Sequence, residues 1–182
     1  MSLTHRIATL DDLADIEALM AVSMARLLPE VLDPVQVERS SSSMGLDTLL
    51  VKDGTYFLVF EGETLVGCGG WSRRRTLFGG NHKVGRDDSL ADPQTEPAKI
   101  RAMYTHPDHV RKGVGSYLIA LGEAAARAEG FSAMELGSTA SGLMLYERCG
   151  FVVIEDVSER YEDGVKVPTI RMRKELEPKT PR

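Results

Sequence analysis

Residues 106–118 read HPDHVRKGVGSYL, and this stretch decides how the rest of the sequence is interpreted. Before it lies an apolar run, Ala98–Thr105, which predicts a strand that ends at Pro107. After it, apolar residues recur at helical spacing from Val114 up to Gly130, a typical helix-ending residue. The sequence therefore predicts a strand, a glycine-containing loop and a helix in succession.

The loop has the properties of an anion site. Gly113 and Gly115 stand at the start of the helix, where unpaired N–H groups and the helix dipole favour negative charge. Glycine also lets a phosphate approach the backbone and tolerates unusual dihedral angles. The nucleotide pattern GxxxxGK[ST] is absent, and GxGxxG fails because Leu118 stands where its last glycine belongs. On its own the loop predicts an anion site or only a tight turn.

The flanking sequence predicts a mixed α/β sheet with helices on its faces. Thr9 and Asp12 mark the start of a first helix, and Pro168 suggests an edge or bulge in the last strand. The segment 72–97 is polar, without periodicity, and reads equally as a solvated excursion or a lid that faces the substrate. The predicted strands cover residues 5–8, 56–60, 64–71, 98–105, 132–136, 151–157 and 165–173. The predicted helices cover residues 10–24, 34–43, 114–130 and 140–149.

Composition excludes several classes of partner. A formal net charge of −5 opposes nonspecific binding to nucleic acid. There is no apolar run of signal-peptide or membrane-spanning length, so we expect a cytoplasmic protein without a membrane partner. Cys68 and Cys149 are isolated, and His106 and His109 have no further ligands nearby, so no disulfide or metal site is expected.

Two motifs together resemble those of the GNAT superfamily of N-acetyltransferases. Residues 106–118 resemble motif A, [RQ]xxGx[GA], although Val110 takes the place of Arg or Gln and Arg111 lies one position later. Residues 139–151, TASGLMLYERCGF, resemble the segment N..A...Y...GF, with Tyr146 at the tyrosine position. Thr139 and Gly142 replace the usual Asn and Ala.

The resemblance covers nearly the whole chain and implies a fold. We expect one domain over residues 1–176, with residues 177–182 as a flexible tail. The family fold has a mixed, mostly antiparallel sheet of about six or seven strands, flanked by helices. Its two central strands, here 98–105 and 132–136, splay apart, and acetyl-CoA lies in the V-shaped opening.

The resemblance also implies the chemistry: direct attack of a primary amine on acetyl-CoA. Tyr146 is the candidate general acid, and an amide near Met103 or Tyr104 would stabilise the oxyanion. Glu135, Glu96 and His106 are candidate bases, without a choice among them. The residues expected to bind the cofactor are Met103, Tyr104, Thr105, Val110, Arg111, Lys112, Gly113, Val114, Gly115, Ser116, Thr139 and Tyr146.

Two other function classes remain open from the sequence. A non-catalytic acyl-CoA-binding or regulatory module would share the loop without needing Tyr146. A sugar-nucleotide or nucleotide enzyme could use the same helix start. The acceptor amine is not specified by the sequence, and the family resemblance is compatible with a homodimer.

Overall fold

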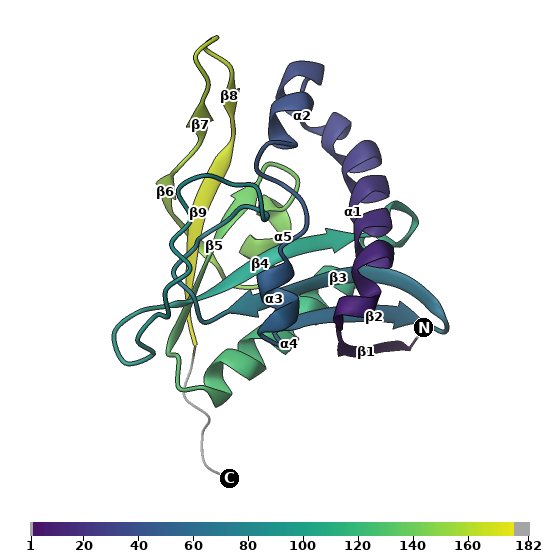
Figure 1. Ribbon diagram of the computed structural model, residues 1–182, viewed down its shortest axis with the longest axis vertical. Coiled ribbons are helices and arrows are strands. Elements are labelled where there is room, and N and C mark those ends of the chain that lie inside the picture. Colours follow the sequence, from purple (N-terminus) through teal and green to yellow (C-terminus); the bar gives the residue numbers. More distant parts are fainter. Residues whose placement is uncertain (1, 177–182) are drawn as a thin grey trace.

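A seven-stranded sheet forms the centre of the computed structural model, which describes residues 2–176 (Figure 1). All neighbouring strands are antiparallel except β4 and β5, which are parallel. This confirms the predicted mixed, mostly antiparallel sheet; the predicted tail 177–182 lies outside the described residues. In spatial order the strands are β1 (Leu3–Ile7), β2 (Tyr56–Glu61), β3 (Thr64–Ser72), β4 (Ala98–Thr105), β5 (Ala133–Thr139), β9 (Thr169–Glu175) and β6 (Val152–Asp156).

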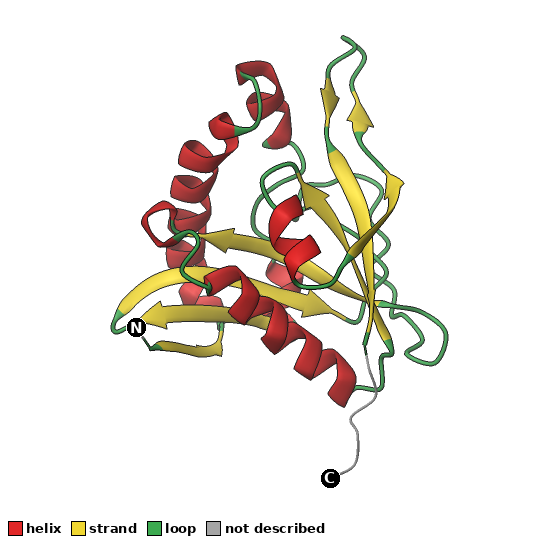
Figure 2. Ribbon diagram, turned by 180° about the vertical axis from the view of Figure 1, so that it is seen from behind, coloured by secondary structure: helices red, strands yellow, loops and turns green. Residues whose placement is uncertain are grey.

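Helices cover both faces of the sheet. α1 (Leu13–Leu27), α2 (Pro34–Ser40) and α3 (Thr48–Lys52) lie on the face towards the viewer in Figure 1. α4 (Val114–Ala128) and α5 (Leu143–Arg148) lie on the opposite face, seen in Figure 2. The 3₁₀ turns η1 (Leu10–Asp12), η2 (Leu28–Glu30) and η3 (Pro107–His109), and a two-stranded ribbon of β7 (Glu159–Arg160) and β8 (Lys166–Val167), complete the fold.

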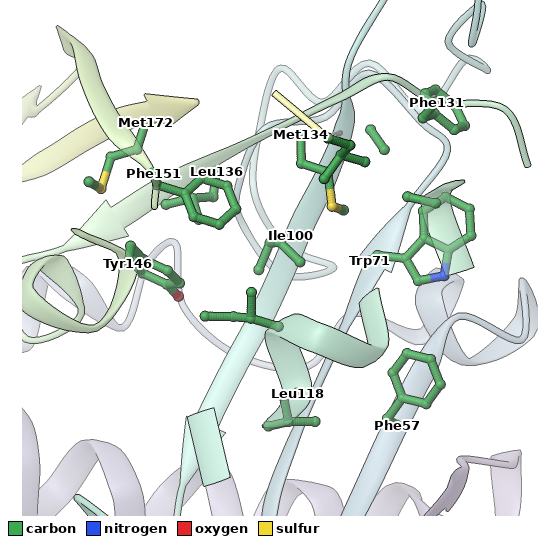
Figure 3. Packing of buried hydrophobic residues seen from close by; sticks show 14 of the residues in the cluster. Phe57, Trp71, Ile100, Leu118, Phe131, Met134, Leu136, Tyr146, Phe151 and Met172 are labelled. Carbon is green, nitrogen blue, oxygen red and sulfur yellow. The ribbon is translucent and has the colours of Figure 1, made fainter. Parts of the chain in front are cut away.

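The alternation of residues along β2 explains why both faces are covered. Phe57 and Val59 pack in the core beneath α4, whereas Tyr56 and Leu58 pack in the core beneath α1 and α3. Successive side chains of a strand point to opposite faces, so an all-apolar strand needs a cover on each side. Figure 3 shows the core beneath α4, in which Trp71 is buried.

The two central strands diverge after a short contact. β4 and β5 pair only where Ala98 meets Met134 and Lys99 meets Glu135. Beyond these positions β4 keeps its ladder with β3, and β5 keeps its ladder with β9. The predicted splay is therefore present, and it leaves one edge of each central strand without a partner strand.

Several predicted bounds were wrong for identifiable reasons. The predicted helix 34–43 ends at Ser40, because the following serine hydroxyls bond to nearby main-chain carbonyls instead. The predicted strand 165–173 is two strands, β8 and β9, interrupted at Pro168. Since β9 lies between β5 and β6, the expected edge position was wrong; the proline lies outside the ladder, where no N–H is needed.

Candidate functional site

A cavity of about 640 Å³ lies where β4 and β5 diverge. On one face of the sheet the cavity is lined by the start of α4 and by residues of α5. On the other face it is lined by the end of α1 and by η2. Figures 1 and 2 show that these helices lie on opposite faces. The cavity therefore passes through the opening between the strands and can admit one molecule from each side.

The edge of β4 that borders the cavity carries main-chain groups without a partner strand. Met103, Tyr104 and Thr105 line the cavity, as the resemblance implied. The His106 N–H donates to the Val66 carbonyl of β3 at 2.9 Å. Because antiparallel residues alternate between pairing and non-pairing positions, the peptide groups of Thr105 turn to the other edge, towards the cavity.

A β-bulge distorts β4 beside these residues. Ala102 has a φ of 49°, and the register of β3 and β4 shifts at this point. The buried Tyr56 hydroxyl donates to the Ala102 carbonyl at 2.7 Å. In a trans peptide the N–H points opposite to the C=O, so the Met103 N–H is held pointing away from Tyr56. Bulges of this kind commonly redirect a group next to a site.

The loop before α4 presents a row of unpaired amides. Arg111 has a φ of 60° and Gly113 a φ of 87°, which turns successive N–H groups to one side. Within residues 2–176, no oxygen accepts a hydrogen bond from the N–H groups of residues 111–116. Together with the positive end of the α4 dipole, these amides form a cradle for an anion. Val110, Arg111, Gly113, Val114, Gly115 and Ser116 line the cavity, whereas Lys112 does not.

The two glycines of the loop have different physical roles. A Cβ on Gly113 would meet no protein atom within 4 Å, but its φ of 87° favours glycine. A Cβ on Gly115 would lie 2.5 Å from Leu145 Cδ2. Gly115 therefore also lets Leu145 of α5 lie close to the start of α4, a packing role that the sequence did not indicate.

Tyr146 lies on α5 and lines the cavity from the α4 side. Its ring meets Phe151 edge-on, with 6.1 Å between the ring centroids (Figure 3). Burial raises the pKa of its hydroxyl above the ordinary value. A Cβ on Gly142 would lie 2.7 Å from the Tyr146 ring, which explains glycine where the family motif has alanine. Thr139, at the end of β5, also lines the cavity.

The three candidate bases all lie away from the cavity lining. Glu135 is buried and bonded to Arg171 at 2.6 Å and to a second arginine. Glu96 pairs with Arg75 at 2.7 Å, and this bond lowers the pKa of its carboxyl to about 2. The His106 ring accepts a hydrogen bond from the Asp108 N–H at 3.2 Å. The ion pairs of Glu135 and Glu96 join distant positions, which no local sequence pattern indicates, whereas His106 bonds within its own turn.

One lining histidine was not predicted as a site residue. His109 Nε2 lies 3.1 Å from Glu61 Oε2, and its buried Nδ1 has no partner among the described residues. Because Glu61 ends β2 and lies 48 residues before His109, no local sequence pattern connects the two. Across residues 2–176, no group of His, Cys, Asp and Glu side chains could hold a metal ion.

Comparison with known proteins agrees with this geometry. The family model described as "Acetyltransferase (GNAT) family" matches residues 23–151. An uncharacterized N-acetyltransferase of Bacillus subtilis (strain 168), YsnE, is 29% identical over 129 residues, which cover 68% of this chain and 73% of that protein. No helix among the described residues has the length and apolar character needed to cross a membrane.

Solved structures share the fold. A GCN5-related N-acetyltransferase of Rhodopseudomonas palustris has a TM-score of 0.69 at 17% identity, over 97% of each chain. The acetyltransferase YncA of Salmonella typhimurium, solved with acetyl-CoA, has a TM-score of 0.63 at 17% identity, over 100% of this chain and 98% of that one. Since the family model spans well over half of the sequence, this chain belongs to the acetyltransferase (GNAT) family and is an acetyl-CoA-dependent acyltransferase.

Proposed function

We propose that this enzyme is an N-acetyltransferase that moves the acetyl group of acetyl-CoA to a primary amine by direct attack, with Tyr146 as the general acid. One observation carries the proposal: a single cavity is bordered by the unpaired amides of Arg111 and residues 113–116, the free edge of β4 and Tyr146. These are the groups needed to hold a pyrophosphate, an extended pantetheine arm and a reacting thioester.

The residues present fit acetyl-CoA. The amides of residues 111–116 would receive the pyrophosphate, since each bond to a charged oxygen is worth about 1.5 to 3 kcal/mol. Main-chain groups of Met103 and Thr105 would pair with the pantetheine amides along the free edge of β4. The bound cosubstrate supplies the activated acetyl group, and the reaction takes place where β4 and β5 diverge.

The β4 bulge supports a role in stabilising the oxyanion. Attack by the amine turns the thioester carbonyl into a tetrahedral oxyanion, which a fixed N–H group stabilises. The Met103 N–H is the candidate, because the hydrogen bond from Tyr56 to the Ala102 carbonyl fixes the peptide group that carries it. No movement of the backbone is then required during the reaction.

Tyr146 supports departure of the thiolate. Because burial raises the pKa of its hydroxyl, Tyr146 stays protonated at neutral pH. The hydroxyl donates its proton to the sulfur as the C–S bond breaks. The attacking amine loses a proton to solvent, and solvent returns one to the Tyr146 oxygen. The products are the N-acetylated amine and coenzyme A with a free thiol.

The test is release of free thiol from acetyl-CoA across a panel of amines. We expect Tyr146→Phe to lower kcat by about 10² to 10⁴ with acetyl-CoA affinity nearly unchanged. Tyr117→Phe is the matched control, because Tyr117 bonds to His5 at 2.7 Å and does not line the cavity. Tight binding of acetyl-CoA without turnover of any amine would instead indicate a non-catalytic module. Thermal stabilisation by ATP or NAD but not by acetyl-CoA would indicate a nucleotide enzyme.

A further inference from the structure

The half of the cavity on the α1 face has an apolar wall. We call this half the acceptor chamber; Ser23, Ser40 and Ser43 line it together with the apolar residues Leu27, Leu28, Val31, Leu32, Phe78 and Val167. The apolar residues come from the end of α1, from η2 and the two residues after it, from the segment 72–97 and from β8. If acetyl-CoA enters from the α4 face, the amine must reach the thioester through this chamber.

The wall at residues 76–80 is fixed to the sheet. Arg101 of β4 donates to the carbonyls of Thr76 and Gly79 at 3.1 Å and 2.6 Å. Phe78 packs over Gly137 of β5, where a Cβ would lie 2.9 Å from its ring. The segment 72–97 therefore includes a wall of the chamber whose main chain is bonded to β4 and whose Phe78 ring packs on β5.

Among residues 2–176, no lysine or arginine that lines the chamber is free to bind an acidic substrate. Arg101 lines the cavity, but its side chain is only 3% exposed and pairs with Asp47 at 2.8 Å. The remaining lining arginines, Arg111 and Arg148, belong to the cofactor loop and to α5, on the α4 side. A carboxylate or phosphate on the acceptor would lose its hydration without gaining a partner.

The charge at the mouth of the chamber is negative. Glu30 is exposed, lines the cavity and forms no ion pair with any residue between 2 and 176. Its carboxylate attracts the ammonium form of an amine towards the chamber. Deeper in the chamber an apolar wall disfavours the ammonium form and lowers the pKa of the amine. The amine then releases its proton to water and becomes the neutral nucleophile, which agrees with the absence of the three candidate bases from the lining.

Contacts between α2 and the β7–β8 ribbon cover the chamber. Gln36 Nε2 donates to the Lys166 carbonyl at 2.9 Å. Arg39 pairs with Asp163 at 2.5 Å and stacks on Tyr161, 5.3 Å from its ring centroid. Both elements also contribute to the cavity lining. The charged pair is exposed and weak, so this cover can open to admit a substrate that is then enclosed.

We infer that the acceptor is a small primary amine with an apolar body and no carboxylate, and not an amino acid or a protein chain. This inference rests on the proposed N-acetyltransferase function. It follows from the apolar wall, the single unpaired carboxylate at its mouth, the engaged Arg101 and the cover formed by α2 and the ribbon.

The experiment compares substrates that differ in one feature. We expect kcat/KM for 2-phenylethylamine to exceed that for phenylalanine at least about a hundredfold, because only phenylalanine places a carboxylate in the chamber. Along a series of linear alkylamines, kcat/KM should rise about fourfold for each methylene until the chamber is filled. Equal or better turnover of phenylalanine, or of a peptide N-terminus, would overturn the inference and leave the proposed function standing. Acetyl-CoA binding without acetylation of any amine would overturn the proposed function itself.

Two variants locate the effect in the chamber. Glu30→Gln should raise KM for 2-phenylethylamine about threefold to fivefold at low salt, and Glu17→Gln on the exposed side of α1 should not. Phe78→Ala should lower kcat/KM for the same amine about tenfold, while Leu10→Ala, at an exposed apolar residue outside the cavity, leaves it unchanged. Acetyl-CoA affinity and thermal unfolding report whether each variant keeps its fold. Equal effects of Phe78→Ala and Leu10→Ala would contradict the assignment.

Discussion

The two halves of the cavity are built in different ways. The cofactor half uses main-chain groups from a short continuous stretch, from β4 to the start of α4. The acceptor chamber uses side chains from α1, η2, the segment 72–97 and β8, which are far apart in sequence. The first half therefore depends little on which side chains it carries, whereas the second half depends on them directly.

The largest expected effect tests how far the acceptor chamber depends on buried side chains. Asp47, only 1% exposed, pairs with Arg101 at 2.8 Å and with Arg86 at 3.0 Å. Asp47→Asn leaves both guanidinium groups without their shared carboxylate, and we expect it to lower the free energy of unfolding by about 3 to 5 kcal/mol. Chemical denaturation measures this. In the folded variant, KM for the amine should rise more than the dissociation constant of acetyl-CoA.

A matched control for Asp47→Asn is Glu129→Gln. Glu129 pairs with Arg73 at 2.6 Å, but that pair is far more exposed than the Asp47 pair, at 28% and 40%, and lies at the end of α4. Its loss should change the free energy of unfolding by less than about 1 kcal/mol. Equal effects of the two substitutions would show that the chamber wall does not depend on the buried pair.

A smaller effect is expected in the cofactor half, where one side chain supports a main-chain group. Tyr56→Phe removes the hydrogen bond to the Ala102 carbonyl and leaves that carbonyl unpaired. We expect a stability loss of about 1 to 3 kcal/mol and a kcat about tenfold lower, with KM for acetyl-CoA little changed. Steady-state kinetics with Tyr117→Phe alongside would check this. A loss of stability with an unchanged kcat would show that Tyr56 supports the fold but not the reaction.

The pH dependence of kcat tests the role of Tyr146, which lies where the two halves of the cavity meet. Since burial raises its pKa, the Tyr146 hydroxyl keeps its proton through about pH 10, where an exposed tyrosine ionises. We expect kcat to rise with pH as the amine loses its proton, without a descending limb below about pH 10. A descending limb below that value, present in the wild type and absent in Tyr146→Phe, would place the hydroxyl in a solvated site.

The sequence predicted the cofactor half far better than the acceptor chamber. The strand Ala98–Thr105 and the helix start at Val114 were predicted to the residue, because proline and glycine mark their ends. The chamber depends on η2 and on the β7–β8 ribbon, which are too short for a periodic signal. Its charge state depends on the pairing of Arg101 with Asp47, and such contacts between distant positions have no local pattern.

The central claim is that main-chain amides, and not basic side chains, hold the pyrophosphate. The most direct measurement is the dissociation constant of coenzyme A by calorimetry for wild type, Gly113→Val and Arg111→Ala. Gly113→Val places a branched side chain at a φ of 87° and distorts the amide row, so we expect binding about ten- to a hundredfold weaker. Arg111→Ala keeps a non-glycine residue at a φ of 60° and removes only the charge, so we expect a change below about threefold. The reverse order would contradict the account.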